Sequence, residues 1–141
     1  MSDPGRFLVN ACWEHELKVT SLFFDNSSLL ALVLSGFQSA PHVFYGFLPR
    51  EEFARKSALK EVMSNKMTTI LMETPYRLNK FLKEVKDYTM GKPINKSVKF
   101  FLGLNLNQEN EQMWRGTIDE IMQKVPVDLK APFIFIKSSE N

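Results

Sequence analysis

The feature that most limits the possible folds of this sequence is an alternation of strand-like and helix-like segments between residues 42 and 137. The strand-like segments are short and rich in aromatic and β-branched residues, and the helix-like segments place apolar residues three or four positions apart. The expected strands cover residues 42–48, 67–73, 96–105, 112–115 and 131–137, and the expected helices cover residues 51–65, 75–88 and 117–124. This alternation predicts an α/β fold with a mixed sheet of about five strands flanked by helices.

The segment before residue 39 is expected to form a unit of its own. It shows a helix, a strand and a second helix, over residues 6–16, 19–24 and 27–35. Gly36 is typical of the residue that ends a helix, and Pro41 indicates a boundary before the first long strand. The predicted organisation is therefore a helix–strand–helix unit over residues 1–38 and a larger domain over residues 39–141.

Charge and cysteine content exclude several classes of protein. The net charge of +2 is too small to indicate a nucleic-acid-binding protein by itself. Cys12 is the only cysteine, so no disulfide can form within the chain, and no cluster of Cys and His indicates a metal site. No apolar run approaches the ~18 residues of a membrane-spanning helix, and the first residues do not resemble a signal peptide. We therefore expect a cytoplasmic protein with no metal and no membrane partner.

One segment stands out as a candidate binding site, Glu73-Thr74-Pro75-Tyr76-Arg77, where a buried strand passes directly into a helix. In open α/β sheets, ligands bind beyond the carboxyl ends of the strands. The first turn of a helix also offers free backbone N–H groups to an anion. The same pattern fits simple helix capping, with Glu73 near the positive end of the helix dipole and Arg77 in solvent. The residues alone leave both interpretations open.

No self-contained catalytic set is evident. The two histidines, His15 and His42, have no neighbours in sequence that indicate a nucleophile–base pair, and there is no glycine-rich phosphate loop. Basic residues gather around two expected helices, at Arg50, Arg55, Lys56, Lys60, Arg77, Lys80, Lys83 and Lys86. Acidic residues are interspersed with them, which favours a solvated face. An RNA-binding face stays a second interpretation, because phosphate contacts require only a basic surface.

Several short motifs occur in the order and at the spacing of one protein family. They are Ser2-Asp3-Pro4-Gly5, Leu34-Ser35-Gly36-Phe37, Phe44-Tyr45-Gly46-Phe47-Leu48-Pro49, residues 70–78 (similar to "IFYESPHRL"), Arg115-Gly116-Thr117-Ile118 and Phe133-Ile134-Phe135-Ile136. Each motif is short, but the ordered set covers nearly the whole chain. On these motifs the chain resembles the tetrapyrrole methylases, and most of all the branch that 2′-O-methylates a cytidine of small-subunit (16S) ribosomal RNA. Within that branch it is most similar to a divergent subgroup of unassigned substrate that reads closer to "ETPYR", as residues 73–77 do here.

The resemblance implies a two-domain enzyme, usually a homodimer, with S-adenosylmethionine in the cleft between the domains. Residues 1–38 then correspond to the end of the cofactor-side domain, and residues 39–141 to the substrate-side domain. The cofactor-binding residues implied are Asp25, Asn26, Ser27, Glu73, Thr74, Pro75, Tyr76 and Arg77, and the substrate-binding residues are Asn105 and Asn107. The expected function is the C-terminal part of a methyltransferase acting on ribosomal RNA, with no residue assigned as general base.

The chain also departs from the family pattern. Most of the family's N-terminal domain, including a Gly-Pro-rich loop and a "DAGTP" segment, has no counterpart in it. The usual "PGPS" turn is Phe23-Phe24-Asp25-Asn26, the usual "RELTK" is residues 104–108, and the histidine of "SPHR" is Tyr76. The complete parent is expected to be an enzyme, whereas this chain alone is not expected to catalyse. It is either part of a longer enzyme or a naturally short remnant.

Two alternative functions stay open on the sequence. One is a non-catalytic remnant that binds RNA or a partner protein, which the basic helix faces motivate. The other is part of a methyltransferase that acts on a corrin or porphyrin. An enzyme part predicts S-adenosylmethionine binding only when the missing N-terminal segment is restored. A remnant that binds RNA predicts salt-dependent affinity of this chain alone for RNA.

Overall fold

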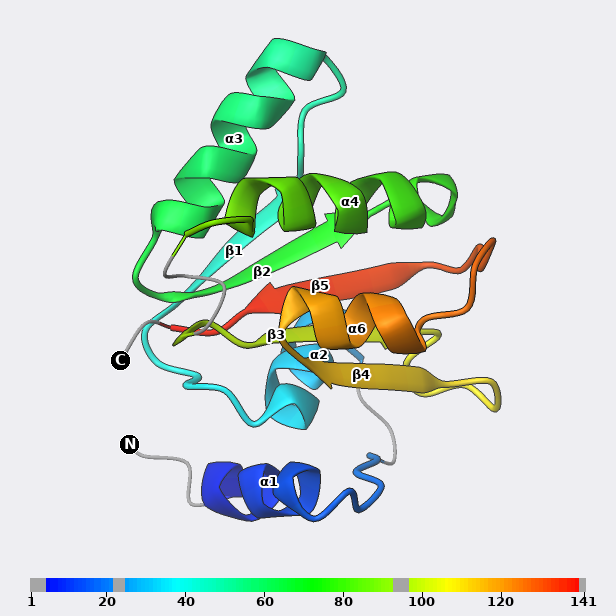
Figure 1. The fold of residues 1–141 in the computed structure, drawn as a ribbon. Coiled ribbons are helices and arrows are strands. Elements are labelled where there is room, and N and C mark those ends of the chain that lie inside the picture. The colour runs from blue at the N-terminus through cyan, green and yellow to red at the C-terminus, as the bar shows by residue number, and fades with distance from the viewer. Residues whose placement is uncertain (1–4, 22–24, 93–96, 140–141) are drawn as a thin grey trace.

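The computed structural model describes residues 5–21, 25–92 and 97–139. Its central feature is a five-stranded sheet with the order β1-β2-β5-β3-β4 (Figure 1). The strands are β1 (His42–Phe47), β2 (Thr68–Glu73), β3 (Phe100–Leu104), β4 (Gln112–Gly116) and β5 (Phe133–Lys137). β1 and β2 are parallel, and the other three pairs are antiparallel. The mixed sheet predicted from the sequence is therefore confirmed.

Helices cover both faces of the sheet. They are α1 (Gly5–Glu14), α2 (Ser27–Ser35), α3 (Glu52–Ser64), α4 (Leu78–Thr89) and α6 (Ile118–Lys124), with a 3₁₀ turn η1 (Pro75–Arg77) before α4. Helices α3, α4 and α6 lie on one face, whereas α2 lies on the other face and contacts α1 (Figure 1). All the expected helices are present. The turn η1 shows that the helix expected from residue 75 begins with a tighter turn.

Local sequence explains where two of these helices begin. The Asn26 side chain accepts hydrogen bonds from the backbone N–H groups of Ser28 and Leu29, which caps α2. Thr117 and Glu120 form a reciprocal capping box at the start of α6, in which each side chain accepts a hydrogen bond from the other residue's backbone N–H. These caps fix the points at which the chain leaves the sheet and enters a helix.

The sheet is buried on both faces because side chains of neighbouring strand residues point in opposite directions. Phe100 and Phe135 pack with Phe81 of α4, and the Phe81 and Phe135 rings meet edge to face at 4.9 Å. Phe101 and Ile136, one position further along their strands, pack on the opposite face with α2. This double burial accounts for the continuous apolar sequences of β3 and β5.

The strand expected over residues 19–24 is not present in the part of it that the structure describes. Residues 17–21 have no regular secondary structure, and residues 22–24 lie outside the described ranges. Before residue 39 the two helices are therefore confirmed, and residues 17–21 between them do not form a strand. Trp13 packs edge to face on Phe101 of β3 with ring centroids 6.0 Å apart, and its indole N–H donates to the carbonyl of Leu34 at 2.8 Å. The division into units at residue 39 stays a prediction.

The described residues contain neither a membrane-spanning helix nor a cluster of metal-binding side chains. None of their helices is both long and apolar enough to cross a membrane. Within the same ranges, histidine, cysteine, aspartate and glutamate side chains do not gather in groups of three or more that could hold a metal ion.

Candidate functional site

A cavity of about 370 Å³ opens at the carboxyl end of β2. The end of β2, the first residue of α2, the loop after β3 and the start of β5 form its walls. The lining residues are Ser27, Phe47, Met72, Glu73, Thr74, Pro75, Gly103, Asn105, Leu106, Gln108, Pro132, Phe133 and Ile134. We call this space the β2-end cavity. It occupies the place where ligands bind in open α/β sheets.

Residues that the sequence proposed for a site meet at this cavity from three separate segments. They are Ser27 of α2, Glu73, Thr74 and Pro75 at the junction of β2 and η1, and Asn105 after β3. Their neighbourhood could not be derived from spacing, because 46 positions separate Ser27 from Glu73 and 32 separate Glu73 from Asn105 (73 − 27 and 105 − 73). The fold therefore brings these residues, which are far apart in the sequence, together at one end of the sheet.

The other proposed residues lie outside the lining of the cavity. Asp25 and Asn26 are exposed beside it, and the Asn26 side chain caps α2. Tyr76 is exposed and Arg77 is half-buried on η1. Asn107 is also exposed.

Both asparagines proposed for the substrate side have left-handed backbone conformations, with φ of 48° at Asn105 and 64° at Asn107. Asparagine tolerates this region better than most residues. The backbone N–H of Asn107 donates to the Glu111 carboxylate at 2.8 Å, which closes the loop after β3. The left-handed backbone therefore favours asparagine at both positions, independently of any role in binding.

The Glu73 carboxylate is held by a buried network. The Arg55 guanidinium donates from Nη1 to Glu73 at 2.6 Å and from Nε to Glu84 at 2.8 Å. The second oxygen of Glu73 accepts the backbone N–H of Thr74 at 2.9 Å. Burial lowers the pKa of Arg55, but its hydrogen bonds with the two glutamates outweigh burial and raise that pKa overall. Glu73 therefore fixes the junction of β2 and η1 rather than facing the cavity as a free carboxylate.

The burial of Arg55 corrects the expectation of a solvated basic face on α3. Arg55 is only 2% exposed, because it lies on the same side of the helix as Ala58, Leu59 and Val62. Sequence reasoning grouped it with exposed lysines and missed this role. The sequence did contain an indication of this burial. Arg55 lies three and four positions before Ala58 and Leu59, which places it within the apolar stripe of the helix.

Four basic residues of α3 and α4, Arg55, Lys56, Lys80 and Lys86, form ion pairs. Ion pairs engage Lys56 with Glu52, Lys80 with Glu84, and Lys86 with Asp119, in addition to the Arg55 network. This pairing favours the solvated-face interpretation for these lysines over an RNA-binding face.

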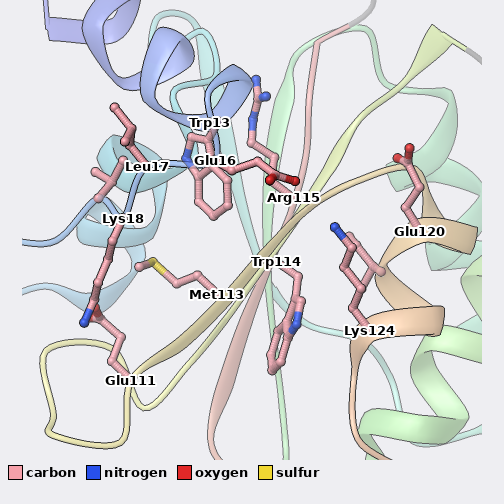
Figure 2. A pocket seen from close by; sticks show the side chains of 12 residues that line it. Trp13, Glu16, Leu17, Lys18, Glu111, Met113, Trp114, Arg115, Glu120 and Lys124 are labelled. Atoms are coloured by element: carbon pink, nitrogen blue, oxygen red, sulfur yellow. The ribbon is translucent and has the colours of Figure 1, made fainter.

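A second cavity, of about 330 Å³, lies between residues 13–19 and the elements β4 and α6 (Figure 2). Its charged lining is balanced, with three cationic and three acidic side chains, Glu16, Lys18, Glu111, Arg115, Glu120 and Lys124. None of the residues proposed from the sequence lines it. The β2-end cavity is therefore the better candidate for the site that the sequence motifs indicate.

Comparison with known proteins gives the relationship of the chain. No family model matches it. Ribosomal RNA small subunit methyltransferase I of Micromonospora olivasterospora is 31% identical over 128 residues, which are 91% of this chain and 39% of the relative. The chain is homologous to part of this methyltransferase. The Synechocystis protein of the same name is 30% identical over 84% of the chain and 40% of the relative. The chain thus spans about two fifths of the length of these curated relatives.

The fold is shared with tetrapyrrole methylases. A solved cobalt precorrin-4 methyltransferase aligns with 92% of this chain and 55% of its own, at a TM-score of 0.54 and 12% identity. At that identity the likeness shows the fold alone. The resemblance stated from the motifs is confirmed: the chain is similar in sequence to ribosomal RNA small subunit methyltransferase I and similar in fold to a tetrapyrrole methylase.

Proposed function

We propose that this chain supplies the C-terminal, substrate-side part of an S-adenosylmethionine-dependent methyltransferase that acts on ribosomal RNA. The observation that carries the proposal is the convergence of Ser27, Thr74, Pro75 and Asn105 on the β2-end cavity. The name of the relatives, ribosomal RNA small subunit methyltransferase I, supports the reaction and the class of substrate. Because the chain spans about two fifths of their length, we propose activity for the complete protein and none for this part alone.

The lining of the β2-end cavity fits part of an S-adenosylmethionine molecule. Met72, Phe133 and Ile134 offer apolar surface for an adenine ring or a thioether chain, and Ser27 and Asn105 offer polar groups for ribose hydroxyls. The volume of about 370 Å³ lies at the lower end of the ~300–1,000 Å³ typical of ligand pockets. These residues therefore fit one side of a cofactor site, which agrees with a cleft completed by another domain.

Bare backbone also contributes to the cavity. Gly103 lines it, and a Cβ atom at this position would lie only 2.8 Å from the Leu106 side chain. A larger residue at Gly103 would push Leu106 out of place and change the shape of the cavity. This close packing supports a binding surface whose shape is set by the fold.

The chemistry proposed for this chain is positioning. S-adenosylmethionine supplies an electrophilic methyl group when it is bound. The residues of this chain would orient the cofactor and the acceptor and exclude water, which accounts for much of the barrier lowering in such transfers. The Glu73 carboxylate is engaged by Arg55 and by Thr74, so we assign it no proton transfer.

The finer parts of the proposal come from the family resemblance. They are a 2′-hydroxyl of a cytidine in 16S ribosomal RNA as acceptor, a homodimer in the complete enzyme and a cytoplasmic location. A porphyrin or corrin acceptor is less favoured, because the tetrapyrrole methylase is related to this chain in fold alone, at 12% identity.

Calorimetric titration with S-adenosylmethionine tests the proposal. Two proteins are compared: this chain, and the chain joined to the N-terminal part of the Micromonospora relative. Only the joined protein is expected to bind, with micromolar affinity or about −8 kcal/mol. Methylation of small-subunit ribosomal RNA by the joined protein then tests the acceptor.

Matched variants localise the binding within the joined protein. Asn105→Ala should weaken it, whereas Asn79→Ala, an exposed residue of α4, should leave it unchanged. Cooperative thermal unfolding of each protein serves as the folding control. A folded joined protein that does not bind S-adenosylmethionine would refute the proposal.

A further inference from the structure

A polar cavity of about 400 Å³ lies at the opposite end of the sheet from the β2-end cavity. Residues after the end of β5 line it, whereas residues at the start of β5 line the β2-end cavity. The two cavities share no lining residue. We call it the Arg115 cavity, after the arginine of β4 that lines it.

The lining of the Arg115 cavity has an excess of positive charge. Among the described residues, three cationic side chains line it, Arg6, Lys99 and Arg115, against one carboxylate, Glu14, which gives a formal charge of +2 (3 − 1). Apart from Phe37, the remaining lining is polar or small, and includes Gln38 and serines at positions 97, 138 and 139. The cations come from α1, from the residue just before β3 and from β4, so the fold brings them together from distant parts of the chain.

Arg115 is a partly buried cation whose hydrogen bonding is incomplete. Its Nη2 donates to the neutral side-chain oxygen of Asn10 at 2.7 Å, and its guanidinium lies 4.8 Å from the centre of the Phe37 ring. Its Nε is buried and has no hydrogen-bond partner within the described ranges. Figure 2 shows the side chain rising from β4 toward α1, whereas Trp114 extends away from it.

No described carboxylate forms an ion pair with Arg115. Burial lowers the pKa of Arg115, and only the more distant charge of Glu14 acts in the opposite direction. The contrast within this molecule is Arg55, whose guanidinium makes short ion pairs with Glu73 and Glu84. A desolvated cation is unfavourable without a counter-charge, so an anion beside Arg115 would offset that cost.

The other two cations are not strongly engaged. The Lys99 ammonium lies 3.8 Å from the Glu120 carboxylate, which already accepts the backbone N–H of Thr117 at 2.7 Å. The Arg6 guanidinium lies 5.0 Å from the Phe7 ring centre and has no ion pair with a described residue. Both can therefore turn toward an anion without breaking a short ion pair.

Gly36 permits the close approach of α1 that forms one wall of the cavity. Gly36 has φ of 65°, and a Cβ atom there would lie 2.9 Å from Val9 and 3.0 Å from Asn10. Because this position has no side chain, α1 approaches closely enough to place Asn10 against Arg115. The arrangement orients the guanidinium and does not neutralise it.

We propose that the Arg115 cavity binds the phosphate group of a ligand. Phosphate is favoured because its oxygens can accept from several donors at once, and the planar guanidinium matches that geometry. The excess charge and the serine hydroxyls suit the same ligand. The phosphate can come from an RNA backbone or from free phosphate, and the site stands independently of the proposed methyl transfer.

Titration of this chain with inorganic phosphate, followed by amide NMR shifts, tests the proposal. Phosphate should shift the backbone signals of Gly36, Gln38 and Ser138 in a saturable way. Arg115→Gln should weaken the binding about tenfold or more, as expected for loss of a charge-assisted hydrogen bond. Lys99→Gln should weaken it too, and the Lys99 side chain is 46% exposed, so this substitution leaves the buried core unchanged. Arg50→Gln, an exposed arginine outside the cavity, carries the same charge change and should have no effect.

A parallel titration with short single-stranded RNA separates the two sources of phosphate. RNA binding whose salt dependence becomes shallower in Arg115→Gln assigns the site to an RNA backbone. Phosphate binding without RNA binding assigns it to a free phosphate group. No saturable shift with either ligand, or shifts that both cavity variants leave unchanged, would overturn the proposal.

Discussion

At the scale of single residues, the two desolvated arginines of this chain are stabilised differently. Arg55 is 2% exposed and makes ion pairs with two glutamates, so its charge is balanced inside the fold. Arg115 has an asparagine and an aromatic ring as neighbours instead. The first arrangement joins β2, α3 and α4, whereas the second leaves a cation open to a ligand.

Arg55→Met should destabilise the protein strongly, because it leaves the Glu73 carboxylate buried without its cation. Breaking one side of a buried ion pair typically costs about 3–5 kcal/mol in the free energy of unfolding. Urea denaturation followed by tryptophan fluorescence measures that loss. Lys56→Met is the matched control, since Lys56 and its partner Glu52 are both 76% exposed and such pairs contribute about 0–1 kcal/mol. Similar losses in the two variants would contradict the role given to Arg55.

At the scale of elements, the capping box of α6 makes stability depend on pH. The backbone N–H of Thr117 lowers the pKa of the Glu120 carboxyl below its usual value, because it hydrogen-bonds to the ionised form. A lowered folded-state pKa gives stability that is fully present above the unfolded pKa, near ~4.3. That contribution is lost as the pH falls through the lower folded-state value.

Glu120→Gln should therefore remove a pH-dependent part of the stability. The difference in unfolding free energy between the natural protein and the variant should be largest near pH ~6 and should shrink toward pH ~3. Urea denaturation at several pH values measures the difference. A difference that stays constant over this range would show that the Glu120 charge does not contribute through the cap.

Sequence patterns predicted the positions of the helices better than they predicted which strands pair with one another. Helices α3, α4 and α6 follow local apolar spacing, and α3 and α6 also begin at side-chain caps, so local sequence patterns were enough to predict them. The strand expected over residues 19–24 failed in its described part for a physical reason. A strand requires a neighbouring backbone to pair with, and residues 17–19 instead line the cavity beside β4. Strand propensity carries no information on whether such a partner exists.

At the scale of the whole molecule, the strand order could not be predicted from local patterns. β5 is the last element of the chain, yet it lies between β2 and β3 and is antiparallel to both. This insertion brings Phe133 beside Glu73 and places Asn105 at the same end of the sheet. The motif at residues 73–77 was visible in the sequence, but the cavity to which it contributes depends on this topology.

The same topology predicts unequal effects of removing the two ends of the chain. Deletion of residues 133–141 removes the strand that joins β2 to β3, and with it the buried Phe135 and Ile136, so cooperative unfolding should be lost. Deletion of residues 1–16 removes α1, which has no buried residue. That variant should lower the melting temperature, because the packing of Trp13 on Phe101 is lost, but should keep a cooperative transition.

Circular dichroism and Trp114 fluorescence during urea denaturation distinguish the two deletions, since Trp114 is present in both. Coincident sigmoidal transitions are expected for the protein without α1, and a gradual, non-cooperative change for the protein without β5. A cooperative transition in the protein without β5 would mean that β1–β2 and β3–β4 form a stable core without their central strand. In that case the β2-end cavity would not depend on the closing strand for its place in the fold.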